Sequence, residues 1–571
     1  MAGKIGQQVQ LAGQPIFILK EGSQRTRGKE AQHNNIIAAK AVAAAVRATL
    51  GPKGMDKMLV NSIGDIIITN DGATILKEMD IEHPAAKLIV EVAKTQDDEV
   101  GDGTTTAAIF TGELLKNAEE LLELNVHPTI IVNGYTLASI ESKKILQTLV
   151  RSVNIKDRDL LLTIASTSIT GRISELSKDI FINLAVDAVL SVADIENGKN
   201  IEGSNMLNKQ FPTKAGNYKQ ITTIDIDNIR IEKIAGGSLD SSELVNGVIV
   251  DKEKFHSSMP KKIKEAKILL YDGALEIKKT NAKAEIYIEL PSQLKLFIDN
   301  EEQMLQNSVD KIIDIGANVV FVQQGIADIL GDYLAKAGIY AVSRADKKDM
   351  EKLARATEAK ILSTLKDVNI SDLGKACIVE EKKIGTKLMT FVTECANSKA
   401  MSIIIRGGEK HVLDEAERIL HDALCVVKVA LEDEKIVAGG GSPEIELALR
   451  LREYSAKFSG REQLAISKFA DAIEVIPRAL AENAGLDPID KIAEMRSQHE
   501  KGIKTAGLNV FTGKVVDMWE EGVVEPCRIK MQAINSATEA ANMILSIDDV
   551  ISSKKGGGVP PGVPPGQMEG M

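Results

Sequence analysis

The chain has 571 residues, of which 44% are hydrophobic and 26% are charged, so it is long enough for several domains and has the composition of an ordinary globular protein. Its 81 Asp and Glu residues outnumber its 70 Lys and Arg residues, and the resulting net charge of −11 argues against binding to nucleic-acid backbones or anionic membranes. Aromatic residues make up only 3%, too few for the stacking surfaces that hold single strands, so we expect neither nucleic acid nor membrane as a partner.

The cysteines predict the compartment rather than a site. They are widely spaced and form no C-x-x-C pair, which argues against a disulfide framework and against a zinc site; they are Cys377, Cys395, Cys425 and Cys527. The N-terminal residues carry no apolar signal core, and no apolar run reaches 18 residues. We expect a cytoplasmic protein with free thiols.

The first part of the chain reads as mostly helical. Residues 35–50 are Ala-rich with helical spacing, and Gly51-Pro52 ends them. A short Ile-rich strand is predicted at 65–69, a helix from Pro84 to about residue 96, and another over 104–124. The C-terminal part has the same character, with helices predicted over 409–433 and 443–454.

The middle of the chain reads differently. Residues 221–234 alternate between apolar and polar and predict a strand. Further on, strands at 317–322 and 339–342 flank a helix at 326–336, which indicates an α/β insert. The simplest arrangement is a helical domain built from both chain ends, with the insert between them and hinges at the two crossings. Residues 554–571, rich in Pro and Gly, predict a flexible tail.

The strongest local motif is Gly101-Asp-Gly-Thr-Thr-Thr106, directly before an apolar helix. Two glycines allow a close approach of the backbone to a ligand, and hydroxyls beside the free amides of a helix N-terminus suit phosphate oxygens. Asp102 would then hold Mg²⁺, which bridges carboxylate and phosphate oxygens. The alternative is an ordinary capped helix after a glycine turn, and the local pattern favours neither reading.

Two more glycine loops repeat this device, at 50–54 and at 439–441 before Ser442-Pro443. Each alone is more often a tight turn than a nucleotide site. All three lie in the helical blocks at the two chain ends, which would form one domain.

Two carboxylates are further candidates. Asp71 follows an Ile-rich strand, where an Asp-Gly turn is the commoner explanation. Asp422 projects along the apolar seam of its predicted helix, where an acid is costly unless it is paired or functional. Its structural alternative is a pair with Arg418, four residues earlier.

Together these segments resemble one family, the group II chaperonins, which include the archaeal thermosome and its eukaryotic cytosolic relatives. The resemblance extends in collinear order over nearly the whole chain. Its motifs are Leu50-Gly-Pro-Lys-Gly-Met-Asp-Lys-Met58, Asn70-Asp-Gly-Ala-Thr-Ile-Leu76, Gly101-Asp-Gly-Thr-Thr-Thr106 and Val437-Ala-Gly-Gly-Gly441, with shorter matches between them.

The resemblance implies a multidomain α+β fold. A mostly helical equatorial ATP-binding domain would comprise 1–154 and 410–553, and a small α/β intermediate hinge domain 155–225 and 374–409. An α/β apical domain would comprise 226–373, with a helical lid protrusion at about 276–305. The subunit would be an ATPase of a double-ring cage that folds unfolded protein clients, and the cage would consist of copies of this chain alone or together with paralogous subunits.

The resemblance also implies the site residues. Asp102 would ligate Mg²⁺, and Asp71 and Asp422 would position and activate the attacking water. Glu525 would accept the ribose hydroxyls, and Arg172 stands where many group II sequences have Lys. The residues expected to contact ATP are Leu50, Gly51, Pro52, Asn70, Gly103, Thr104, Thr105, Thr106, Thr167, Ser168, Gly440 and Glu525.

Three alternatives stay open. A scaffold that kept nucleotide binding is the rival from another class, although the intact acids favour turnover. A monomeric phosphotransferase is the weaker one. The helix with Ile326, Leu330, Tyr333 and Leu334 is a candidate client surface, but a core-facing stripe has the same pattern.

Overall fold

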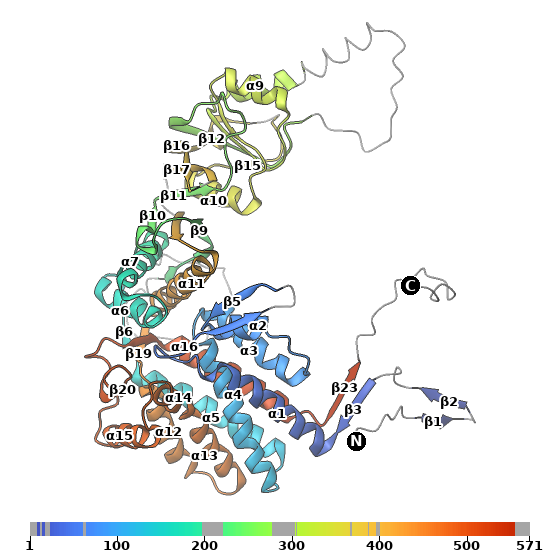
Figure 1. Cartoon of the computed structure of the whole chain (residues 1–571), viewed down its shortest axis with the longest axis vertical. Coiled ribbons are helices and arrows are strands. Elements are labelled where there is room, and N and C mark those ends of the chain that lie inside the picture. Colours follow the sequence, from blue (N-terminus) through green and yellow to red (C-terminus); the bar gives the residue numbers. More distant parts are fainter. Residues whose placement is uncertain are drawn as a thin grey trace.

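The computed structural model describes residues 8–11, 14–17, 23–60, 64–196, 221–276, 303, 305–365, 368–385, 387–395 and 400–553. These residues form three bodies stacked along the long axis of the molecule (Figure 1). The lower body is helical, the middle body has helices around a small sheet, and the upper body is built on a larger sheet. The predicted multidomain α+β fold class is confirmed.

The lower body combines helices from both chain ends around one core. Alanine-rich faces let α1 and α4 approach closely, since a Cβ at Gly112 would lie 2.3 Å from that of Ala43. Buried rings of Phe110, Tyr135 and Phe469 meet edge to face at its centre. Its helices are α1 (Gly28–Arg47), α2 (Gly72–Glu78), α3 (Pro84–Val100), α4 (Thr104–Glu123), α5 (Pro128–Leu149), α12 (Ser442–Ser455), α13 (Arg461–Ile473), α14 (Val475–Asn483), α15 (Pro488–Glu500) and α16 (Cys527–Leu545).

Small antiparallel sheets surround these helices. Near the chain ends, β3 (Ser23–Arg27) pairs with β23 (Asp549–Ser553). Between α1 and α2, β4 (Lys57–Val60) pairs with β5 (Ile66–Thr69). The remaining strands are β19 (Lys435–Ala438) between β22 (Val524–Pro526) and β6 (Arg151–Ser152), β20 (Ala506–Asn509) with β21 (Lys514–Asp517), and β1 (Gln8–Leu11) with β2 (Gln14–Phe17).

The middle body is formed where the chain crosses twice. Strand β18 (Met401–Gly407) lies between parallel β9 (Ile229–Ala235) and antiparallel β10 (Glu243–Val245). A second core joins this sheet to the helices α6 (Arg158–Ile169), α7 (Glu175–Val192) and α11 (Lys410–Asp433). The predicted boundary at residue 410 stays a prediction, and the packing of α11 with α6 and α7 favours one after Asp433.

The upper body has a seven-stranded mixed sheet, in which parallel β12, β13 and β14 follow the βα pattern expected for 317–342. Helices α9 (Asp328–Lys336) and α10 (Lys347–Thr357) pack on it. The strand order is β11 (Gly247–Val250), β17 (Lys387–Cys395), β16 (Gly374–Ile384), β12 (Lys262–Tyr271), β13 (Val319–Val322) and β14 (Tyr340–Val342), with β15 (Ile361–Leu362) beside β12.

Two expectations for the insert need correction. The strand predicted over 221–234 is interrupted: β8 (Ile221–Thr223), which pairs with β7 (Asp194–Glu196), is separated from β9 by a 3₁₀ turn. The Asp225 carboxylate accepts the Asp227 amide at 3.1 Å and stabilises that turn. Two further 3₁₀ turns are Leu239–Ser241 and Ile370–Asp372.

The candidate client face on α9 belongs to the core. Ile326, Leu330 and Leu334 are buried in the upper core, and Tyr333 packs against it half-buried. The apolar stripe therefore stabilises the upper body itself. The predicted lid protrusion, apart from residues 276, 303 and 305, and the tail at 554–571 lie outside the described residues.

Candidate functional site

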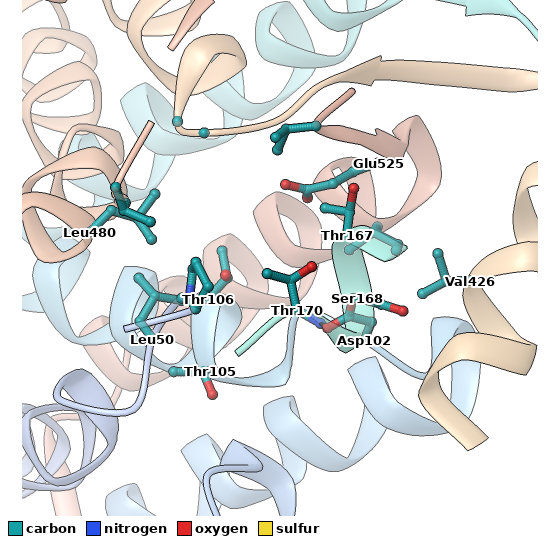
Figure 2. A pocket seen from close by; sticks show the side chains of 18 of the residues that line it. Leu50, Asp102, Thr105, Thr106, Thr167, Ser168, Thr170, Val426, Leu480 and Glu525 are labelled. Atoms are coloured by element: carbon teal, nitrogen blue, oxygen red, sulfur yellow. Dashed lines mark hydrogen bonds between the residues drawn. The ribbon is translucent and has the colours of Figure 1, made fainter. Parts of the chain in front are cut away.

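A cavity of about 400 Å³ lies where the two helical blocks of the lower body meet the lower end of α6 (Figure 2). Gly103 and Gly440, from opposite chain ends, both line it. Asp422 is the only predicted site residue that does not. The predicted residues on its wall are Leu50, Gly51, Pro52, Asn70, Asp71, Asp102, Gly103, Thr104, Thr105, Thr106, Thr167, Ser168, Gly440 and Glu525.

The N-terminus of α4 faces this cavity. Gly101 ends α3 with φ 69°, and Gly103 precedes α4 with φ 77°, so both occupy the left-handed region that glycine adopts readily. The first-turn amides of α4 have no intrahelical partner. Gly103 has no side chain to cap them, so they are available to a ligand. The side chains of Thr105 and Thr106 are drawn beside them in Figure 2. The arrangement suits an anion with several oxygens.

Asp102 is held rigidly between these glycines. Its Oδ1 accepts the Gly103 amide at 2.6 Å, and its carbonyl accepts Gln96 Nε2 at 2.9 Å. Gln96 also donates to the carbonyl of Ile529 at 3.2 Å, which ties the loop to α16. Burial raises the pKa of Asp102, and Arg172 opposes that shift. A cation beside this carboxylate would offset the cost of its burial.

Asp71 caps α2 and faces the same loop. Its carboxylate accepts the amides of Ala73 at 3.4 Å and Thr74 at 2.8 Å, so the predicted turn role is present. It also accepts Thr104 Oγ1 at 3.2 Å. Asp71 therefore joins α2 to the first turn of α4.

Arg172, in the turn after α6, connects Asp422 to the cavity. Its Nε donates to Asn70 Oδ1 at 3.0 Å, its guanidinium pairs with Asp422, and Nη2 lies 4.0 Å from Asp71 Oδ1. The suggested pair of Asp422 with Arg418 is wrong, because Arg418 pairs with Glu415.

The electrostatics of this cluster are dominated by burial. Desolvation raises the pKa of Asp422 well above its usual value, Asp71 and Asp102 raise it further, and Arg172 counteracts them. Burial lowers the pKa of Arg172, but the three carboxylates outweigh it, so the guanidinium stays charged. One cation thus compensates several buried acids.

The opposite wall is more apolar and tightly packed. At Gly51, with φ 82°, a Cβ would lie 2.4 Å from Leu480 Cδ2. At Gly440, with φ 64°, a Cβ would lie 2.6 Å from Met518 Sδ. Leu50 and Leu480 face this side in Figure 2. A flat apolar group would find contacts here, away from the Thr-rich helix end.

The middle body reaches the cavity through the end of α6. Thr167 Oγ1 accepts the Val524 amide at 3.3 Å. A Cβ at Gly171, with φ 85°, would lie 2.2 Å from the Pro52 carbonyl oxygen. The turn that carries Arg172 is therefore packed directly against the loop 50–54, and a movement of the middle body would alter the cavity.

Lys530, which no sequence motif singled out, lines the cavity and is buried. Its Nζ lies 2.8 Å from Glu525 Oε2 and 2.9 Å from Glu444 Oε1. Its helical spacing to Ala533, Ile534 and Ala537 was the available signal, because a lysine within an apolar stripe needs a partner.

Within the described ranges, no helix is both long and apolar enough to cross a membrane.

The family model described as TCP-1/cpn60 chaperonin matches residues 42–555. Thermosome subunit beta of Archaeoglobus fulgidus is 53% identical over 97% of this chain and 98% of its own. A thermosome subunit of Pyrococcus horikoshii is 54% identical over 96% and 95%. The solved open-state monomer of a group II chaperonin from Methanococcoides burtonii is 47% identical, with a TM-score of 0.57 over 78% of this chain and all of that one.

Proposed function

The chain belongs to the TCP-1/cpn60 chaperonin family, and we propose that it is a group II chaperonin subunit that binds and hydrolyses ATP in the cavity of its lower body to fold client proteins. The observation that carries this proposal is the convergence of glycine loops from both chain ends on one cavity beside buried acids. Relatives named as thermosome subunits support it.

In this proposal the triphosphate lies against the first turn of α4. Amides and hydroxyls of Gly103, Thr104, Thr105 and Thr106 would bind its oxygens. The adenine would lie between the loop 50–54 and the glycines at 440–441, where the packing leaves room for backbone contact only. Thr167 and Ser168 would approach from the middle body, and Glu525 would accept the ribose hydroxyls.

The residues present fit Mg²⁺. The described residues contain no cluster of three His, Cys, Asp or Glu that would form a complete protein cage. Mg²⁺ is usually held by one or two carboxylates together with substrate phosphates and water, and Asp102 offers one half-buried carboxylate on the cavity wall at the phosphate end. When bound, the ion would neutralise phosphate charge.

Asp71 and Asp422 are the proposed catalytic carboxylates, and they act on the attacking water as acceptor and base. Each would accept a hydrogen bond from the attacking water, and the ionised Asp422 would take its proton. Asp422 lies on α11 of the middle body, so closure of that body onto the nucleotide would complete the site. Hydrolysis would then depend on the conformation of the subunit.

Arg172 should tune the pH dependence of hydrolysis. The base acts only when ionised, so turnover rises as pH increases through the pKa of Asp422. Arg172→Met removes the cation that opposes the raised pKa, and the acidic limb should move to higher pH by roughly one to three units. Arg172→Lys keeps the charge and should give a nearly wild-type profile. Superimposable profiles of kcat for wild type and Arg172→Met would contradict this role.

The β4–β5 hairpin is the proposed contact with a neighbouring subunit. Among the described residues its two strands pair only with each other, so no further strand covers their outer edges, and Met58 and Val60 are exposed on it. The β3–β23 pair, which joins the two chain ends, is likewise a two-stranded sheet in the described part of the chain. Edges of this kind are normally covered, and a second copy of the chain in a ring would cover them. Subunit names among the relatives support this assembly.

Charges on this hairpin should prevent ring formation. Met58 and Val60 are 65% and 66% exposed in the isolated chain, so Met58→Asp with Val60→Asp should fold. Burying the new carboxylates at each subunit contact would cost several kcal/mol. Sedimentation should show mostly single subunits, whereas Leu464→Asp, at an exposed position of α13, should keep the rings. Intact rings of the hairpin variant would refute this contact.

Electron microscopy with and without ATP and a transition-state mimic tests the whole proposal. We expect double rings that close with the mimic, together with ATPase activity that promotes refolding of an unfolded client. Nucleotide-bound rings without turnover would favour the scaffold alternative. Active single subunits would favour a phosphotransferase.

A further inference from the structure

Lys530 forms a buried ion triad at the edge of the cavity. Its ammonium lies 2.8 Å from Glu525 Oε2 and 2.9 Å from Glu444 Oε1, and its side chain is only 10% exposed. Burying an ammonium is costly unless such partners compensate it. Figure 2 shows the carboxylate of Glu525 directed toward the cavity. The triad therefore joins a cavity group to two charges behind it.

Three elements of the C-terminal block fix this geometry. Glu525 lies in β22 opposite Val437 of β19, Glu444 is in the first turn of α12, and Lys530 is in the first turns of α16. A Cβ at Gly439 would lie 2.9 Å from Glu525 Oε1, so backbone confines the carboxylate on that side. Lys530 holds it on the other.

The triad has two carboxylates and one ammonium. Burial raises the pKa of Glu525 and Lys530 opposes the shift, while the charges of Glu444 and Asp102 add to it. Oε2 of Glu444 is buried and has no partner among the described residues. Without Lys530, the buried Glu444 and the half-buried Glu525 would stand together without the ammonium that compensates both, and a proton would bind to one of them.

We propose that Lys530 is a positioning residue that holds Glu525 as a fixed carboxylate acceptor for the vicinal hydroxyls of the nucleotide sugar, and thereby sets the preference for ribonucleotides. This inference rests on the proposed ATP site. Lys530 acts through Glu525. Its ion pair with Oε2 fixes the orientation of the carboxylate, and its charge keeps the carboxylate ionised, so that it can accept hydrogen bonds from the sugar.

The preference for ATP over a nucleotide without sugar hydroxyls follows from the hydrogen bonds that such a nucleotide cannot donate. A sugar without hydroxyls covers the Glu525 carboxylate but donates no hydrogen bond to it, so the carboxylate keeps only its ion pair with Lys530. Hydrogen bonds to charged groups are worth roughly tenfold to a hundredfold in binding. We expect wild type to bind ATP more tightly than 2′,3′-dideoxy-ATP by about that factor.

The test is calorimetric titration of the full-length protein with both nucleotides. Lys530→Met should reduce the preference to about threefold or less, mainly by weakening ATP, because a neutral acceptor contributes less. Lys87→Met, on the exposed face of α3, is the matched control and should keep the wild-type preference. An unchanged preference in Lys530→Met overturns the inference.

A pH series separates positioning from a general structural effect. In Lys530→Met the raised pKa of Glu525 should make the preference small at pH 6 and restore it as pH increases and the carboxylate ionises. Wild type should show little change over the same range. A preference lost equally at every pH overturns the inference.

Two further variants complete the design. In a Glu525→Gln background, Lys530→Met should change the preference no further, because both residues act through one group. If Lys530→Met does not fold, Lys530→Arg is measured instead, since it keeps the charge but not the geometry. It should lower the preference and leave it independent of pH; a wild-type preference overturns the inference. Wild type that binds neither nucleotide refutes the ATP site itself.

Discussion

Replacing Asp422 with alanine should lower steady-state ATP hydrolysis by roughly 10²–10⁴-fold, the range typical of a missing general base. ATP binding and ring assembly should persist, because Asp422 does not line the cavity wall and reaches it through Arg172. The variant removes the acid that pairs with Arg172, but the guanidinium keeps its hydrogen bond to Asn70 and lies 4.0 Å from Asp71, so the fold should tolerate the change.

The measurement is turnover under saturating ATP, with binding followed by fluorescence of Trp519, the single tryptophan of the chain. Trp519 precedes Glu521 and Gly522, which line the cavity. Glu417→Ala, on the same helix but away from the cavity, where it is half-buried and paired with Lys233, is the matched control and should hydrolyse ATP at the wild-type rate. Unchanged turnover in Asp422→Ala would count decisively against the site.

Replacing Asp102 with asparagine should also lower hydrolysis, by roughly a hundredfold or more, through loss of the metal position. Chelation of divalent ions in the wild-type protein should have the same effect and should weaken ATP binding as well. In chelator, however, Asp102→Asn should bind ATP at least as tightly as wild type, because one carboxylate fewer repels the triphosphate.

This reversal distinguishes a metal ligand from a structural loop residue. Asp98→Asn, at an exposed acid near the end of α3, the helix that precedes the loop of Asp102, controls for the change in net charge and should leave both measurements at wild type. Magnesium-dependent turnover of Asp102→Asn within about threefold of wild type would contradict the assignment.

Local chemistry made much of the lower body predictable. The start of α4 at Thr104 follows from the glycine before it, whereas α12 begins at Ser442, one residue before the predicted Pro443, with Gly441 as its N-cap. Helix α3 continues to Val100, beyond the predicted residue 96, because the first left-handed residue is Gly101. Glycine therefore ended the helix where the apolar spacing alone did not.

Long-range partners were not predictable from spacing. Local periodicity showed that Asp422 is costly, but its cation is 250 positions away in sequence and belongs to another segment. The apolar stripe on α9 could not be assigned from its spacing either, because a face that packs on a sheet and a face that binds clients carry the same kinds of residue. Lys530 was missed although its neighbours in the helix are apolar, since its two acid partners lie on other elements.

The core of the lower body has a consequence for how the subunit is made. Its buried residues come from the segment that ends at Leu146 and from the one that begins at Val437. About 290 residues separate them, which at about 5–20 residues per second is roughly 15–60 s of translation. During that time the emerging helices α1 to α5 must wait beside the ribosome without the partners that cover their apolar faces. A nascent chaperonin subunit is therefore itself prone to aggregate and a natural client for other chaperones.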